Sequence, residues 1–293
     1  MSLSSAIVGA ASKPLVTEID SRWTMAYAAA LGDSLPAYFD TTRESPVVAH
    51  PMFPVCFEWP LLIAMRSEFG ATGLTTAEAL RVVHATHDLV IHRPIRAGDR
   101  VSTQLTIAGV EHRKPGAYMV SRLDTLDDGG TPICTSWYGS LYRDVAVDGA
   151  DQPAKPVALP APPIVEEGEP LDEAELDVPA GMAHVYTECA RIFNPIHTDA
   201  AVARAAGLPS IILHGTATLA IAVSRIVEVE AKKDPARVAR IAARFGAMVS
   251  MPSILTVRIL AREDAADGTQ IFFEALNSEG KLAIRDGLVS LRN

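Results

Sequence analysis

The chain has 293 residues, of which 48% are hydrophobic and 21% are charged, and its formal net charge is −9. This composition is typical of a folded protein and excludes an intrinsically disordered one, and the length corresponds to about two ordinary domains. The negative charge and the lack of a basic stripe exclude nonspecific binding to nucleic acid.

The cysteines and the N-terminus predict a reducing, cytoplasmic location. Cys56, Cys134 and Cys189 are too few for a disulfide framework and lack the spacing of metal ligands. The first ten residues lack the basic region and apolar run of a signal peptide. The most apolar stretch, 211–223, is too short to span a bilayer, so we expect a buried helix and no membrane partner.

The first half of the chain predicts two helices followed by strands. After a loose lead-in over residues 1–20, Ser21 is expected to cap a helix that closes at Gly32. Residues 53–68 are mostly apolar and predict a buried helix, although Pro60 argues that it begins later or is kinked. Alternating, β-branched segments then predict strands at 81–92, 100–111, 117–126 and 132–144.

The same order of elements returns in the second half, which indicates a duplication. Residues 149–176 are rich in proline and alanine and predict an extended linker between modules at 1–148 and 177–293. A helix carrying Met182 and Tyr186 and a buried helix starting at Gly215 follow the linker. Strands are then expected at 238–251, 254–261, 270–277 and 281–292.

The most informative stretch runs from Tyr186 to Asp199. Pro195 forces a turn at Asn194, because proline fixes its own φ and pushes the preceding residue out of the α region. This turn presents His197 from a loop, and His214-Gly215 then opens the long apolar helix. A histidine on a loop and a glycine at a helix N-terminus are suited to activating water and holding a carbonyl oxygen.

These residues resemble the MaoC-like dehydratases, also called (R)-specific enoyl-CoA hydratases, of the hotdog fold. The family motif places an Asp two residues before the Asn and a Gly before that Asp, whereas this chain has Ile192 and Arg191 there. The matching residues are Tyr186, Asn194, Pro195, His197, Asp199, His214 and Gly215.

An ungapped superposition of Tyr27 on Tyr186 sets the two halves against each other. Asp33 then falls on Ile192, and Tyr38 falls on His197. In the same superposition, Pro36 falls on Pro195 and Asp40 falls on Asp199, so these residue types are identical in the two halves. The first half therefore keeps the family's Gly-Asp, and the second half keeps its Asn-Pro-x-His.

The resemblance implies an α+β fold of two tandem hotdog modules, each a long central helix wrapped by an antiparallel sheet, with the two sheets joined edge to edge. It implies an acyl-CoA hydratase or dehydratase in fatty acid metabolism, with His197 and Asn194 catalytic. Gly215, Thr216 and Tyr186 are expected to bind substrate, and the degenerate catalytic position is Ile192. Coenzyme A enters as the thioester of the substrate, and no metal or redox cofactor is expected.

Several alternatives remain open at this level. Asn194 either orients the substrate or water, or satisfies the turn backbone. His214 is expected to be structural, Asp199 a helix cap and Tyr186 a core residue with a polar tip. A non-catalytic acyl-CoA-binding protein or inactive subunit of a heteromeric hydratase is the second hypothesis, and a thioesterase that uses Glu188 is the third. A homodimer or hetero-oligomer is compatible with the sequence.

Overall fold

The structure is a computed structural model that describes residues 2–68, 74–75, 82–161 and 169–293. Its first half contains short elements at the N-terminus, then the α-helices α1, α2 and α3, and then a long meander of strands. In chain order these are β1 (Ser2–Ser4), η1 (Ser5–Ile7), β2 (Leu15–Glu18), α1 (Ser21–Ala30), α2 (Pro36–Phe39), α3 (Pro54–Glu68), β3 (Val82–Ile91), β4 (Arg100–Arg113), β5 (Gly116–Asp127), β6 (Pro132–Arg143) and β7 (Ala146–Asp148).

The second half repeats this order of helices and strands. Its elements are β8 (Asp172–Val178), α5 (Met182–Ala190), η3 (Pro195–His197), α6 (Ala200–Ala205), α7 (Gly215–Val229), η4 (Pro235–Arg237), β9 (Val238–Phe245), β10 (Ser253–Ala265), β11 (Gly268–Leu276) and β12 (Leu282–Arg292). In the described part of the chain, no helix is both long and apolar enough to cross a membrane.

One sheet of ten strands joins the two halves, in the order β2-β4-β5-β6-β3-β9-β12-β11-β10-β8. Each half contributes five strands to this sheet. Counted along the chain and read from the edge inward, they follow the order first, third, fourth, fifth, second in both halves. All neighbours in this sheet are antiparallel, and β3 pairs with β9 at the centre, with Asp88 opposite Ala242. The edge-to-edge union of two antiparallel sheets is therefore confirmed. A separate parallel pair, β1 with β7, lies apart from this sheet.

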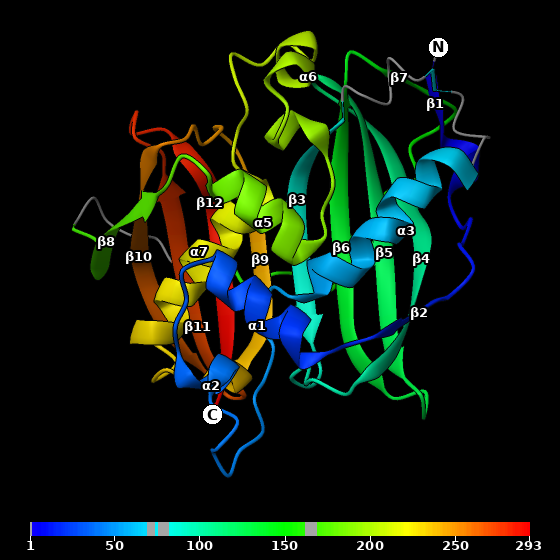
Figure 1. Cartoon of the computed structure of the whole chain (residues 1–293). Helices are drawn as coiled ribbons and strands as arrows, with labels where there is room; N and C mark the ends of the chain where they lie inside the picture. The colour runs from blue at the N-terminus through cyan, green and yellow to red at the C-terminus, as the bar shows by residue number, and fades with distance from the viewer. Residues whose placement is uncertain (1, 69–73, 76–81, 162–168) are drawn as a thin grey trace.

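Each half of the sheet has a long helix on the same face. Figure 1 shows α3 lying across β4, β5 and β6, and α7 across the strands of the second half. Helix α7 is buried on nearly every side, which suits its almost uniformly apolar sequence. Helix α3 begins at Pro54 and continues through Pro60, so the expectation that it begins later is wrong. Pro60 lies on the exposed side of α3. The helix can therefore continue past the proline, because the carbonyl groups on that side can tilt outward toward solvent.

The shorter helices α1 and α5 pack against each other between the two long helices (Figure 1). Tyr27 and Tyr186 are fully buried, and their hydroxyl oxygens lie 3.3 Å apart. These are the two residues that the superposition of the halves sets on each other. Asp20, rather than the predicted Ser21, caps α1, because its carboxylate accepts a hydrogen bond from the Trp23 amide.

The strand that each half places at the edge of the ten-stranded sheet was not predicted. Strand β2 lies in the region expected to be a loose lead-in, and β8 begins at Asp172, inside the predicted linker at 149–176. Both strands form the outer edges of the sheet. Edge strands are often short or charged. Strand β2 has only four residues, and β8 alternates acidic with apolar residues, so neither shows the long β-branched run of a central strand. The module boundaries stay a prediction, and residues 162–168 lie outside the described residues.

A buried ion pair crosses the central seam. Arg240 on β9 donates two hydrogen bonds to Asp88 on β3, at 2.8 and 2.7 Å, and the two side chains are 12% and 13% exposed. Arg240 also donates to the carbonyl oxygen of Val157 at 2.8 Å, which ties the segment after β7 to the seam.

Replacing Arg240 with alanine is expected to lower the free energy of unfolding by roughly 3 kcal/mol, because it leaves Asp88 buried and unpaired. The matched control is Arg258→Ala, which removes an exposed pair with Glu173 and should cost less than about 1 kcal/mol. Urea denaturation of both variants measures the difference. Equal losses would show that the seam does not depend on this pair.

Candidate active site

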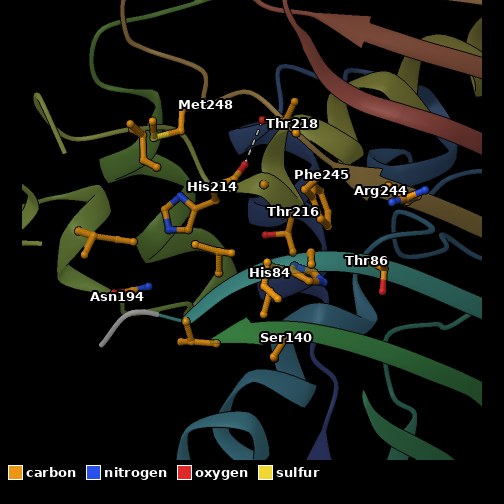
Figure 2. A pocket seen from close by; sticks show the side chains of 18 of the residues that line it. His84, Thr86, Ser140, Asn194, His214, Thr216, Thr218, Arg244, Phe245 and Met248 are labelled. Carbon is orange, nitrogen blue, oxygen red and sulfur yellow. Dashed lines mark hydrogen bonds between the residues drawn. The ribbon is translucent and has the colours of Figure 1, made fainter. Parts of the chain in front are cut away.

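A cavity of about 580 Å³ lies between the two halves. The first half contributes one face of α3 and parts of β3 and β6, and the second half contributes the loop after α5, the start of α7 and the end of β9. Figure 2 shows Asn194, His214 and Thr216 on the wall from the second half, and His84 and Ser140 on the strands of the first half. Of the residues predicted to form the site, the cavity brings together Ile192, Asn194, His197, Gly215 and Thr216.

His197 ends the short helix η3 that follows the Asn194-Pro195 turn. Its Nδ1 lies 2.8 Å from the carbonyl oxygen of Ile212. Because a carbonyl only accepts hydrogen bonds, Nδ1 carries the proton and Nε2 keeps its lone pair. Burial lowers the pKa of His197 to about 4, so the ring is neutral near pH 7. The arrangement gives the cavity a neutral imidazole with an unprotonated Nε2, for which the described residues supply no hydrogen bond.

His214 stacks on His197, with ring centroids 3.7 Å apart. Its Nε2 lies 3.2 Å from the hydroxyl oxygen of Thr187 on α5. Burial, assisted by the neighbouring imidazole of His197, lowers the pKa of His214 to about 2. The stacking on His197 and the contact with Thr187 hold both imidazole rings in place, and a structural role for His214 stays a prediction.

Gly215 is the first residue of α7, and the cavity reaches the start of this helix. The first amides of a helix have no intrahelical acceptor, and the helix dipole favours negative charge beside them. A β-carbon at Gly215 would lie 3.1 Å from the Phe245 ring. Glycine therefore allows the Phe245 ring to pack closely against the start of the helix.

Replacing Gly215 with valine is expected to weaken acyl-CoA binding at least roughly tenfold, because the branched side chain must displace the Phe245 ring, which borders the cavity beside the helix start. Gly215→Ala is the matched control and should bind nearly as well, since the Phe245 ring needs to move by only a few tenths of an ångström. Calorimetric titration with a saturated acyl-CoA measures both. Unchanged affinity in Gly215→Val would place the thioester elsewhere.

Tyr186 does not line the cavity, so its predicted contact with substrate is corrected. The side chain is fully buried, and its hydroxyl donates to the Thr216 hydroxyl oxygen at 3.0 Å. Burial raises the pKa of Tyr186, which keeps the phenol protonated. Its role is to hold Thr216, whose side chain is 8% exposed and borders the cavity.

Ile192 stands in the cavity wall and is 4% exposed. The preceding Arg191 adopts a left-handed conformation that ends α5, and its guanidinium lies 3.9 Å from the centre of the Trp23 ring. Arg191 therefore points away from the cavity and does not supply a charge beside Ile192. Asp199 accepts hydrogen bonds from the amides of Ala201 and Val202 and caps α6, as predicted.

The acids suggested by the sequence lie elsewhere. Glu188 is exposed on α5, and Asp33 accepts a hydrogen bond from the Leu35 amide, 3.1 Å away, outside the cavity. Among the described residues that line the cavity, the one carboxyl group belongs to Glu58 on α3. Sequence reasoning missed Glu58, and the available signal was an acidic residue inside an otherwise apolar helix.

His84 on β3 was also missed, because a histidine in an alternating strand carries no distinctive signal. Its ring stacks on Tyr138 at a centroid distance of 3.6 Å and lies 4.4 Å from Phe245. Burial lowers the pKa of His84, so this third imidazole in the cavity wall, after His197 and His214, is also neutral.

The counterpart site in the first half is closed. Tyr38, which replaces the histidine, and His50 are each 1% exposed, and their ring centroids lie 5.6 Å apart. Burial lowers the pKa of His50 to about 3. Neither residue borders the cavity, so the described residues of the two halves build one open site and one filled site.

Five exposed cationic residues are among those that border the cavity, although the whole chain is acidic. They come from the β4–β5 turn, the end of β6, the end of β9 and β12. Arg113 already pairs with Glu111 and Arg244 with Asp286, each at 3.2 Å. The excess of positive charge over these two carboxylates still favours an anionic group, such as a phosphate, at this side of the cavity. The five cationic residues are Arg113, Lys114, Arg143, Arg244 and Arg285.

Two family models match the chain. Residues 165–280 match the model described as a MaoC like domain, and residues 6–136 match the FAS1-like, dehydratase domain region. The chain is similar to the peroxisomal enoyl-CoA hydratase 2 of Arabidopsis thaliana, with 22% identity over 72% of this chain and 68% of that protein. It is 25% identical to 3-hydroxyacyl-thioester dehydratase Y of Mycobacterium tuberculosis over 96% of both chains.

Solved structures share the fold. A MaoC-like dehydratase from Phytophthora capsici superposes with a TM-score of 0.83 at 19% identity, covering 98% of this chain and 96% of that one. A Mycobacterium tuberculosis protein described as having a double hotdog fold superposes with a TM-score of 0.61 at 16% identity, covering 97% and 96%. The predicted pair of hotdog modules is confirmed.

Proposed function

Because this chain belongs to the MaoC-like dehydratases and has a double hotdog fold, we propose that it adds or removes water at the α,β position of an acyl-CoA thioester. The observation that carries the proposal is the neutral His197 with a free Nε2, in one cavity with the start of α7. The exposed cations that border the cavity suit the phosphates of coenzyme A.

In the hydration direction, Nε2 of His197 removes a proton from a water molecule whose oxygen bonds to the β-carbon. The electron pair of the double bond moves toward the thioester carbonyl, and the first amides of α7 stabilise the enolate-like oxygen. The imidazolium then gives its proton to the α-carbon, so that the elements of water are added and His197 ends neutral. The low pKa of His197 makes its protonated form a strong acid, which favours this second transfer, and makes the neutral ring a weaker base for the first.

Asn194 is the second proposed catalytic residue. It is half-buried, borders the cavity, and its side chain does not cap η3. An amide free of the turn has both a donor and an acceptor for the attacking water or the thioester. We therefore favour orientation of the reactants over satisfaction of the turn backbone.

The test of this function is purified protein with a panel of enoyl-CoAs of different chain lengths. Loss of the conjugated thioester absorbance without release of free thiol is expected. Release of thiol would instead indicate a thioesterase, for which Glu188 is excluded by its exposed position outside the cavity. Binding without either change would support the second candidate, a non-catalytic acyl-CoA-binding subunit, which Ile192 in the cavity wall favours.

A further inference from the structure

Glu58 lies on the face of α3 that borders the cavity. The residues of this face are spaced as one helical stripe, i, i+3, i+4 and i+7, and consist of Val55, Glu58, Trp59 and Leu62. Three of the four are apolar, which suits a hydrocarbon chain. Glu58 is the exception that a purely hydrocarbon occupant does not explain.

The carboxyl group of Glu58 is half satisfied. The side chain is fully buried, and Oε1 accepts a hydrogen bond from the Ser136 hydroxyl on β6 at 2.5 Å. Oε2 is buried and has no hydrogen-bond partner among the described residues. Burial raises the pKa of Glu58 to about 7, so the neutral acid, with one donor hydrogen, is substantially populated near neutral pH.

An unpartnered carboxyl oxygen inside a protein is costly, and a leucine at this place would fit the rest of the stripe. The other parts of the cavity already suit the other parts of an acyl-CoA. In the proposed function, the exposed cations would contact the phosphates, and His197 and the start of α7 would contact the thioester. The stripe on α3 is left for the acyl chain beyond the reacting carbons.

We propose that Glu58 recognises an uncharged oxygen, a hydroxyl or keto group, on the part of the acyl chain that lies along α3. The proposal rests on the acyl-thioester function and names its substrate class. The acid hydrogen can be donated to a keto oxygen, and the free lone pairs can accept from a hydroxyl. A site built to hydrogen-bond a substrate oxygen discriminates against the analogue that lacks it, because its own polar group is then left unpaired.

The experiment compares the affinity of the full chain for dodecanoyl-CoA with its affinities for dodecanoyl-CoAs that carry one hydroxyl at successive carbons from C4 outward. These chains are saturated, so calorimetry measures binding without turnover. At least one hydroxy isomer is expected to bind roughly tenfold or more tightly than dodecanoyl-CoA. Glu58→Gln should keep most of this preference, since an amide also donates and accepts.

Glu58→Leu should abolish the preference and tighten binding of dodecanoyl-CoA. Ile63→Met, on the exposed side of the same helix and outside the cavity, is the matched control and should leave the ratio of affinities unchanged. Equal affinity of the wild type for all chains, or an unchanged ratio in Glu58→Leu, would overturn the proposal while the acyl-thioester function stands. Failure of every acyl-CoA to bind would instead refute that function, and this proposal with it.

Discussion

Replacing His197 with alanine is expected to lower the rate of crotonyl-CoA hydration by about 10²–10⁴-fold, the usual contribution of a positioned acid–base group. In the proposed mechanism the same nitrogen removes the proton from water and returns it to the α-carbon. The variant loses both transfers, while the amides of α7 that hold the thioester oxygen are retained. The effect should therefore appear in kcat and leave acyl-CoA affinity within a few-fold.

The matched control for this variant is His184→Ala. His184 is exposed on α5 and lies 3.1 Å from the Thr198 carbonyl oxygen, so it is a histidine of the same region outside the cavity. Its replacement should change turnover less than about twofold. Turnover that survives in His197→Ala would assign the base to another residue, and His84 would be the next histidine to replace.

The pH dependence provides an independent readout of His197. Burial lowers its pKa to about 4, so the base is neutral above that value, and activity should fall only as the pH drops through about 4. Stability imposes a second limit. Histidines whose folded pKa is depressed, such as His50 and His87, stabilise the fold above pH ~6.5 and lose that contribution as the pH falls. Circular dichroism at each pH separates unfolding from titration.

Replacing Ile192 with aspartate is expected to raise hydratase turnover by roughly 10²-fold. Ile192 occupies the position at which the motif of the MaoC-like dehydratases has its catalytic Asp. It borders the same cavity as His197. With a carboxyl group at this position, one group could remove the proton from water while the other delivers a proton to the α-carbon. In the wild type, His197 is proposed to carry out both transfers. The gain should disappear in the double variant with His197→Ala.

The same substitution should cost stability. Ile192 is 4% exposed within the main hydrophobic cluster, so a carboxylate there is poorly solvated and its pKa should be raised. We expect a loss of roughly 2–4 kcal/mol, read from urea denaturation. Ile196→Asp, at another isoleucine of the cavity wall, is the matched control and should give no gain in turnover. Strong wild-type hydration that Ile192→Asp destroys would mean that the site depends on an apolar side chain at this position.

The central strands and the turn around His197 could be predicted from the sequence, because local rules determine them. Alternating β-branched segments and the Asn194-Pro195 turn are encoded within a few residues. The edge strands β2 and β8 could not be predicted in this way. Their stability comes from pairing with β4 and β10, which are far away in the chain.

The parts of the site that come from the first half were also missed. Glu58 reads as one acidic residue in an apolar helix, and only the packing of α3 against β6 and the second half makes it border the cavity. The reverse applies to Tyr186, whose match to the family motif suggested contact with substrate. The pairing of α1 with α5 buries its hydroxyl against Tyr27 and Thr216 instead.

The continuous seam between β3 and β9 also affects how such a protein can evolve. In a symmetric pair of identical single-module chains, every substitution appears twice, so a change that improves one site is imposed on its mirror image. Here one polypeptide encodes both sides of the seam, and each side mutates independently. Tyr38 could fill one half while His197 was kept in the other, and Glu58 could be placed opposite a single thioester site without a second copy elsewhere.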